Sequence, residues 1–217
     1  MVKAVLLNIC ALLLLLAAAV PAAAAPAPEP QVLEFEVRRD GTPIGHHRVT
    51  ITRDGDETRV AIDIDFRVTM AGVLTLYRYT HSSEEVWRGD RLVRLRSTTD
   101  NDGKAEYLNA VAEGDALRVD GSGYQGLLPA QTMPTSYWRS DFVERRPIMD
   151  SQDGHVLDVS IRPARYETAS LGNAPVPARR YHVTGEFDWY LWYDAEGNWV
   201  KSAFRAMDGS SIDYRRK

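Results

Sequence analysis

The chain has a single cysteine among its 217 residues, Cys10, which excludes a disulfide framework and a zinc site built from thiolates. It also lacks an excess of basic residues, because 26 Lys and Arg stand against 30 Asp and Glu and give a net charge of -4. Nucleic acid is therefore not an expected partner. The content of 44% hydrophobic and 26% charged residues is typical of a globular protein and argues against a polytopic membrane protein.

Sequence motifs of the common enzyme classes are also missing. The chain contains no Gly-x-Ser-x-Gly nucleophile elbow, no His-Glu-x-x-His zinc motif and no glycine-rich phosphate loop before a helix. The segment Asp100–Gly103 is similar to part of a calcium loop, but Thr98 and Asn109 occupy the first and last ligand positions, where Asp and Glu are required. The sequence thus predicts a hairpin turn there, no metal or cofactor, no catalytic residues and no enzymatic activity.

The histidines provide the feature that is most compatible with proton transfer. His81 shares a predicted strand face with Tyr77 and Tyr79, an arrangement that suits either a general acid or base or a half-buried residue with a hydrogen-bond partner. His46 and His47 are neighbours in a predicted strand and point to opposite faces, so they cannot bind one metal as a simple pair. We interpret both as surface or rim residues.

A long apolar run lies at the N-terminus of the chain. Lys3 precedes the almost wholly apolar stretch Val5–Val20, and an Ala- and Pro-rich stretch follows. This layout predicts a secretory signal peptide over residues 1–27, cleaved after Ala24 or Ala27. The alternative is an uncleaved membrane anchor, for which the apolar run is shorter than the about 20 residues of a membrane span. We therefore expect a periplasmic or secreted protein whose mature chain has no transmembrane span and no cysteine.

Downstream of Gln31, apolar and polar residues alternate with a period of two. In the clearest example the apolar positions of one face are Val60, Ile62, Ile64, Phe66, Val68 and Met70. Strict alternation over this length predicts a β-strand with one buried face, because a helix would distribute the same residues around its circumference.

Asp-Gly pairs recur between the predicted strands, as expected for tight hairpin turns that need a residue tolerant of positive φ. Their glycines are Gly41, Gly55, Gly103, Gly154 and Gly209. The spacing matches one strand and one turn for each step, so residues 28–217 are predicted to form a single, mainly all-β domain of roughly nine to eleven strands. The expected architecture is an antiparallel β-meander that forms a curved open or half-barrel sheet.

One stretch, between Gly121 and Pro147, breaks the strand pattern. Within it the run Thr135–Glu144 is predicted to form the one short helix of the mature chain, with Pro134 just before its N-terminus. We expect this helix to pack on the concave face of the sheet. A second stretch, Ala169–Pro177, is rich in Gly, Asn and Pro and is predicted to be an exposed loop.

The densest group of aromatic residues lies in Phe187–Tyr193, where Trp189 and Trp192 fall on opposite faces of a predicted strand. An antiparallel strand with one solvated face is not expected to be apolar on both, so the second face must be covered or line a cavity. The predicted helix with Tyr137 and Trp138 is the candidate cover. Two interpretations stay open. Trp138 packs on Trp192 in an ordinary core, or the aromatic residues line an apolar ligand cavity between sheet and helix.

Candidate ligand-binding residues follow from the second interpretation. They are the large aromatic residues of the central strand, the predicted helix and the C-terminal strand, together with the neighbouring histidine. The eight residues are Tyr77, Tyr79, His81, Trp87, Tyr137, Trp138, Trp189 and Trp192. An apolar chain buried against such a wall would gain about 0.8 kcal/mol for each methylene.

Several short segments, in order along the chain, resemble a bacterial secreted family known as domain of unknown function 6134. They are Phe35–His47, Tyr77–Tyr79 with Trp87, Met133–Trp138, and Leu191–Asp194 followed by Trp199-Val200. The likeness covers residues 32 to 215. It implies a β-rich periplasmic protein of a Gram-negative bacterium and supplies no catalytic residues. The pattern is also distantly similar to half-barrels of the lipoprotein-carrier type, in which a curved sheet wraps a helix or a lipid, although fold does not fix function.

These observations support three functions. The leading prediction is a periplasmic protein that binds or carries an apolar ligand such as a lipid or an acyl chain, with the predicted helix as a lid. The alternative is a structural or interaction protein of cell-envelope assembly, whose interior is filled and whose partner is another envelope protein. The third is an envelope hydrolase with His81 or His155 as its base, for which the sequence presents no recognisable nucleophile.

Overall fold

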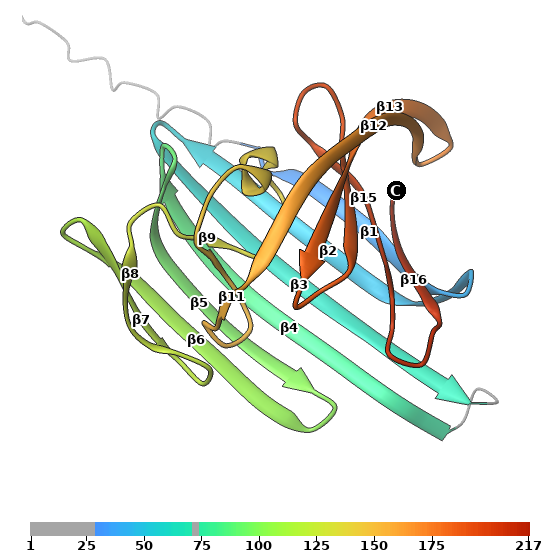
Figure 1. Ribbon diagram of the computed structural model, residues 1–217, viewed down its shortest axis with the longest axis horizontal. Coiled ribbons are helices and arrows are strands. Elements are labelled where there is room, and N and C mark those ends of the chain that lie inside the picture. Colours follow the sequence, from blue (N-terminus) through green and yellow to red (C-terminus); the bar gives the residue numbers. More distant parts are fainter. Residues whose placement is uncertain (1–28, 71–73) are drawn as a thin grey trace, which may run out of the picture.

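The computed structural model describes residues 29–70 and 74–217, so the predicted signal peptide, residues 1–27, lies outside the described range. Most of the described chain is extended and belongs to one large antiparallel sheet that is twisted and curved (Figure 1). The predicted all-β antiparallel architecture is confirmed. The main sheet has 13 strands, more than the roughly nine to eleven expected from the turn spacing.

The first part of the sheet is a meander in which each strand pairs with the next through a tight turn. The strands are β1 (Gln31–Arg39), β2 (Thr42–Asp54), β3 (Glu57–Met70), β4 (Leu74–Arg88), β5 (Arg91–Asn101), β6 (Lys104–Glu113), β7 (Ala116–Gly121) and β8 (Gln125–Pro129). The predicted Asp-Gly turns at Gly41, Gly55 and Gly103 each join two of these strands. All three glycines have positive φ, the conformation for which glycine is favoured.

The second part of the sheet is a shorter meander from the C-terminal half. Its strands are β12 (Val159–Leu171), β13 (Ala174–Gly185), β14 (Trp189–Tyr193), β15 (Trp199–Arg205) and β16 (Ser211–Arg216). The last strand, β16, pairs antiparallel with β1, with Tyr214 opposite Val37, so the two meanders join inside the sheet. The edge strands are β8 and β12, which do not pair with each other within the described residues. The sheet is therefore open, as predicted.

The chain passes from the β8 edge to the β12 edge through residues 130–158, which we call the crossing segment. Its elements are β9 (Met133–Pro134), the helical turn η1 (Ser140–Val143), β10 (Ile148–Met149) and β11 (Val156–Leu157). The segment lies across the concave face of the sheet (Figure 1). Met133, Phe142 and Ile148 are buried there in the same core as the sheet residues. The crossing segment thus fills the place where the sequence predicted a helix.

The predicted helix over Thr135–Glu144 is wrong, because this run contains only the four-residue 3-10 turn Ser140–Val143. Tyr137 has a φ of 59°, in the left-handed region, which interrupts a right-handed helix. The backbone N–H of Thr135 donates to the carbonyl of Met149, so this stretch runs beside β10 instead of bonding to itself. In the part of the chain that the structure describes, no helix has the length and apolar character of a membrane span.

The main core lies between the concave face and the crossing segment. On β1, Phe35 and Val37 are fully buried and the residue between them is not, which confirms the predicted alternation. On β3, Val60 and Ile62 are buried, whereas Phe66 further along the same face is only half-buried. Burial therefore declines along β3 toward an end of the concave face that the crossing segment leaves uncovered.

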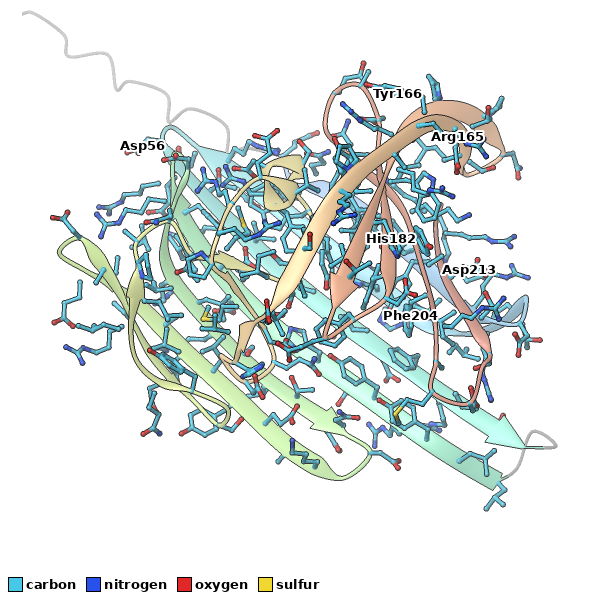
Figure 2. The ribbon with its side chains drawn as sticks, in the orientation of Figure 1. Asp56, Arg165, Tyr166, His182, Phe204 and Asp213 are labelled. Carbon is cyan, nitrogen blue, oxygen red and sulfur yellow. The ribbon has the colours of Figure 1, made fainter. Side chains whose placement is uncertain are left out.

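The long hairpin β12–β13 is bent, with an irregular register between Pro163 and Tyr166. Figure 2 shows Arg165 and Tyr166 on the outer side of this hairpin, where Tyr166 is 63% exposed. The predicted exposed loop over Ala169–Pro177 is wrong, because most of these residues continue the two strands and only a tight turn separates them. The distal half of the hairpin contacts β15 and β16 from outside the main core.

Trp192 belongs to a second, smaller core beneath this hairpin. It packs with Ala169, Ala178 and Val200, on the face of β14 opposite to Trp189. The indole N–H of Trp192 donates to Glu167 at 3.2 Å. The second apolar face of β14 is therefore covered by a β-hairpin, and the helix that was expected to cover it is not required.

Replacing Trp192 with alanine should release the distal half of the β12–β13 hairpin. We expect the free energy of unfolding to fall by about 3 kcal/mol, the lower end of the range for a large aromatic residue removed from a core. Urea denaturation measures this loss, and hydrogen exchange should quicken in β12 and β13 in particular. The exposed Tyr166 of the same hairpin is the control, since Tyr166→Ala should change stability by less than about 0.5 kcal/mol. Unchanged exchange in Trp192→Ala would contradict the role given to this core.

Candidate functional site

The structure places the eight residues predicted to bind a ligand in three separate regions. Those near the uncovered end of the concave face are Tyr77, Tyr79, Tyr137 and Trp189. Those buried in the main core are His81, Trp87 and Trp138. Trp192 lies on the opposite face of the sheet, so it cannot share a pocket with the other seven.

The covered part of the core contains a buried carboxylate, Glu85 on β4, which is 1% exposed. Its Oε2 accepts a hydrogen bond from the Trp87 indole N–H at 2.7 Å and another from the Trp138 indole N–H at 3.0 Å. The Arg139 guanidinium lies 4.7 Å from the centre of the Trp87 ring, within cation–π range. Because Trp87 is on the sheet and Trp138 is on the crossing segment, this Glu85 cluster (Glu85, Trp87, Trp138, Arg139) connects the two.

The Glu85 cluster is closed to ligands, since Trp87 is fully buried and Trp138 is 8% exposed. Burial raises the pKa of Glu85, and the two indole hydrogen bonds and the charge of Arg139 act in the opposite direction. The Trp87 and Trp138 rings meet edge to face with centroids 6.0 Å apart. The predicted packing of Trp138 on Trp192 is therefore wrong, because Trp138 packs on Trp87 instead.

Two buried histidines, His47 and His81, lie on the same inner face. The Nδ1 atom of His81 is hydrogen bonded to the hydroxyl of Thr99 at 2.8 Å. Neither ring nitrogen of His47 has a hydrogen-bond partner among the described residues. Burial lowers the pKa of His47 to about 3 and that of His81 to about 4, so both rings are neutral near pH 7.

The adjacent residues His46 and His47 point to opposite faces of β2, as predicted. His46 is on the outer face, with Nε2 2.7 Å from Asp63 Oδ1. His47 is 3% exposed, so its assignment to the surface or rim is wrong. It packs among the rings of Phe35, Trp199 and Tyr214.

The uncovered part of the concave face, which we call the open end, is lined by five aromatic residues from three parts of the chain. Phe66 on β3 stacks on Tyr79 of β4 with ring centroids 4.9 Å apart. Trp189 on β14 stacks on Phe204 of β15 at 4.6 Å (Figure 2 labels Phe204). Tyr137 of the crossing segment lies 5.3 Å from Trp189. All five rings are only partly buried, so they remain accessible to a ligand.

Tyrosine hydroxyls add polar groups to the open end. Burial raises the pKa values of Tyr79 and Tyr137. The carboxylate of Asp150 acts in the same direction on Tyr79 and Tyr137. These phenols therefore stay protonated at physiological pH, and they can donate hydrogen bonds to a carbonyl, carboxylate or phosphate oxygen.

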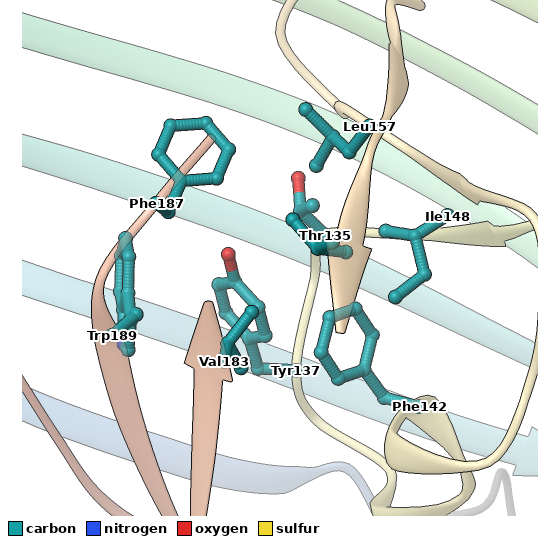
Figure 3. Close-up of a pocket in the computed structure, with 9 residues that line it drawn as sticks. Thr135, Tyr137, Phe142, Ile148, Leu157, Val183, Phe187 and Trp189 are labelled. Atoms are coloured by element: carbon teal, nitrogen blue, oxygen red, sulfur yellow. The ribbon is translucent and has the colours of Figure 1, made fainter. Parts of the chain in front are cut away.

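Behind the open end the interior is nearly filled. A cavity of about 10 Å³ lies between the crossing segment and the strands β13 and β14 (Figure 3). It is lined by Thr135, Tyr137, Phe142, Ile148, Leu157, Val159, Val183, Phe187 and Trp189. This is about the volume of a single water probe, so an acyl chain enters only if these side chains move. A ligand cavity of the size expected for a small-molecule site is not preformed there.

The outer face of the sheet carries an open, polar groove of about 290 Å³ that the sequence did not predict. Short hydroxyl and carboxylate side chains dominate its lining. The residues with outward-facing side chains are His46, Asp63, Asp65, Thr80, Ser82, Thr98 and Asp100. Ile64, His81 and Thr99 also border the groove, but they alternate with these residues along the strands and their side chains are on the inner face. Over residues 29–70 and 74–217, no group of three His, Cys, Asp or Glu side chains is placed to hold a metal ion. The groove therefore offers hydrogen bonds to a polar molecule.

The two histidines considered as general bases lie in different surroundings. His155 is on the surface, with Nε2 3.0 Å from Glu186 Oε2. His81 is 3% exposed and bonded to Thr99 inside the core. Neither arrangement presents a nucleophile to solvent, which is what covalent catalysis requires.

Sequence reasoning missed Glu85, Phe66 and Phe204 as parts of these sites. Glu85 is two residues from Trp87 on a strand, so the two side chains share a face. A carboxylate on the same face as a large apolar residue was the signal that could have identified it. Phe66 and Phe204 belong to distant strands, and only the assembled sheet brings them to one end. Tyr77 was identified correctly as a neighbour of Tyr79, and its hydroxyl donates to Asn101 at 2.7 Å.

The chain matches the model of a known protein family. The family model described as Domain of unknown function (DUF6134) matches residues 35–217. No curated protein matches the chain. The match covers the sheet from β1 to β16 together with the crossing segment, so the Glu85 cluster and the open end both lie within it.

The two indole donors should make the protein sensitive to the acceptor at position 85. Glu85→Leu leaves both N–H groups unpaired, at a cost of about 1 to 3 kcal/mol each. Glu85→Gln keeps an acceptor oxygen and should retain most of the stability. Because the pKa of Glu85 is raised above its usual 4.5, the wild type loses stability as pH rises through that raised value. Urea denaturation should therefore show Glu85→Gln equal to wild type at pH 4.5 and at least as stable at pH 8. Equal losses for Leu and Gln would contradict the hydrogen-bonding role.

Acid should destabilise the protein through its buried histidines. Their pKa values are lowered, so the unfolded chain binds protons that the folded chain does not, and stability falls as pH drops from 6.5 toward 4. His47→Leu removes the more strongly shifted group and should be close to neutral at pH 7.5, because His47 makes no hydrogen bond there. Urea denaturation at pH 7.5, 6 and 4.5 should give a shallower loss for the variant. The exposed His46→Leu is the control, and a variant as acid-sensitive as wild type would overturn the assignment.

Proposed function

This chain belongs to the DUF6134 family, and we propose that it is an exported, non-enzymatic protein that binds an apolar or amphipathic molecule at the open end of its sheet. The ligand class is a lipid or another molecule with an acyl chain. The observation that carries the proposal is the partial exposure of five aromatic rings on the concave face, the face that is otherwise covered by the crossing segment.

The two halves of the open end supply complementary surfaces. Phe66 and Tyr79 form a stacked pair on one side, and Trp189 and Phe204 form a second stacked pair on the C-terminal strands. An apolar chain that lies against these rings removes apolar area from water at about 25 cal/mol for each Å². The protonated hydroxyl of Tyr79 donates a hydrogen bond to the polar end of the ligand, which fixes the ligand's orientation.

Deeper binding requires movement of the crossing segment. The interior cavity holds about one water, and Tyr137 and Trp189 both line it. Displacement of the Tyr137 side chain would extend the open end into the core, while the adjacent residue, Trp138, would stay attached to the sheet through the Glu85 cluster. The crossing segment then acts as the lid that was predicted for this region, without being a helix.

A second candidate function is a structural or interaction protein of the cell envelope that binds no ligand. The nearly filled interior favours it, since a cavity of about 10 Å³ is what a packed core without a ligand has. The two candidates differ in whether the open end binds an apolar probe.

Export is proposed from the arrangement of Lys3, the apolar run Val5–Val20 and the Ala-rich stretch after it. Expression of the full chain in a Gram-negative host, followed by mass measurement of the periplasmic product, should give a protein that begins after Ala24 or Ala27. An intact N-terminus in the membrane fraction would contradict it.

The ligand proposal is tested with N-phenyl-1-naphthylamine, a dye that fluoresces in apolar sites, and with palmitate as competitor. The wild type should bind the dye and release it to palmitate. Trp189→Ala should raise the dissociation constant by about tenfold, which corresponds to about 1.4 kcal/mol. The matched control is Tyr190→Ala, because Tyr190 is the next residue and packs in the second core on the opposite face.

Two outcomes would contradict the ligand proposal. Dye fluorescence that does not rise with wild type, together with a periplasmic product whose native mass shows no bound acyl species, would favour the structural candidate. Equal losses in Trp189→Ala and Tyr190→Ala would show that stability, not the open end, controls binding.

A further inference from the structure

The hairpin of β3 and β4 extends beyond the neighbouring strands. The pairing of β3 with β2 ends at Phe66 opposite Gly45, and the pairing of β4 with β5 ends at Tyr79 opposite Asn101. Beyond these rows, β3 and β4 pair only with each other among the described residues, up to Met70 opposite Leu74. Figure 1 shows the hairpin passing the other strands at one end of the sheet.

This extension exposes apolar side chains that no core requires. Leu74 is 53% exposed and Leu76 is 51% exposed, two residues apart on β4. Single exposed apolar residues are ordinary on protein surfaces. Leu74 and Leu76 lie together on the part of β4 that projects beyond the neighbouring strands, where they form a local apolar patch. Such patches mark interaction sites.

A pair of arginines follows the leucines toward the body of the sheet. Arg67 and Arg78 are directly opposite each other in the β3–β4 register, and both are exposed. Like charges in directly opposed positions destabilise a strand pair. Neither guanidinium has an ion-pair or hydrogen-bond partner within the described part of the chain. An anionic group bound between them would remove this repulsion.

Acidic residues lie behind the arginines. Asp65 is two residues from Arg67 on β3, and the carboxylate of Asp102 accepts a hydrogen bond from the Arg78 backbone N–H at 3.3 Å. From Leu74 toward the body of the sheet, the order of the described residues is thus apolar, basic, acidic. This order matches a membrane surface, in which hydrocarbon is followed outward by anionic phosphates, and the acidic row limits how deeply the hairpin enters.

We propose that this hairpin docks the protein on a lipid bilayer that contains anionic phospholipids. Strand residues advance about 3.3 Å each, so Leu76 and Leu74 lie about 7 and 13 Å beyond Arg78 along the strand. Interfacial segments bury their apolar face about 5 to 10 Å into the headgroup and acyl boundary. The leucines therefore reach the acyl boundary while the guanidinium groups of Arg67 and Arg78 bind phosphate oxygens. A second copy of the chain fits less well, because hairpins that meet end to end bring the two arginine pairs together.

Vesicle co-sedimentation tests the proposal, which goes beyond the proposed ligand binding and does not depend on it. The wild type should bind vesicles with about 30% phosphatidylglycerol in phosphatidylcholine at 0.1 M NaCl and should bind pure phosphatidylcholine more weakly. The double variant Leu74→Ser/Leu76→Ser should bind at least about tenfold more weakly. The double variant Arg67→Gln/Arg78→Gln should lose about fivefold for each arginine, and this loss should shrink at 0.5 M NaCl.

The matched control is Leu127→Ser, because Leu127 on β8 is also 53% exposed and lies at the edge of the sheet. The Leu127→Ser variant should bind vesicles as the wild type does. The Trp189→Ala variant should also bind them as the wild type does, which would show that vesicle binding does not depend on the open end. Circular dichroism and thermal unfolding confirm that each variant is folded. Absence of wild-type binding to the anionic vesicles, or equal binding by the leucine variant, would overturn the proposal. A concentration-dependent dimer that the leucine variant abolishes would assign the surface to a second copy instead.

Discussion

The hydrogen bonds that Glu85 accepts from Trp87 and Trp138 are the interaction on which the rest of the molecule depends. A sheet this large has one face that must be covered, and among the described residues the segment that runs from one edge to the other covers it. That segment has little regular structure, with two-residue strands and one helical turn. The indole N–H of Trp138 connects this segment to Glu85 on β4, and the indole N–H of Trp87 on the same strand donates to the same carboxylate oxygen.

This attachment divides the concave face into two parts with different properties. Near Glu85 the face is closed, and its groups serve stability. Toward the far end of β3 and β4 the crossing segment no longer covers the sheet, and the aromatic rings of Phe66, Tyr79 and Trp189 stay partly exposed. Exposure of aromatic surface to water is energetically unfavourable, and here it occurs on a face that is otherwise covered. For this reason the proposed binding site is placed there.

The strands and turns could be predicted from the sequence, because alternation and Asp-Gly pairs are local signals. The conformation of the segment that covers the concave face of the sheet could not be predicted in this way. Thr135 bonds to Met149 and Tyr137 adopts a left-handed φ, and both depend on β10, which the local pattern does not reveal. Trp192 was assigned the wrong neighbour because part of its cover, including Ala169, comes from a stretch that was predicted to be an exposed loop. Four of the eight candidate residues lie near the open end, and this proximity is a property of the assembled sheet.

The pairing of β16 with β1 has a consequence for the order of folding. Lys217 bonds to Glu34 across 183 residues, and the ladder beside this contact joins the two meanders. Strand β1, which is synthesised first, therefore completes its pairing only after β16 has been synthesised. Contacts of such long sequence separation carry a large loop-closure entropy and slow the folding reaction. Until β16 arrives, each meander has an unpaired edge at what becomes the interior of the sheet, so the complete sheet forms only after the last strand has been synthesised.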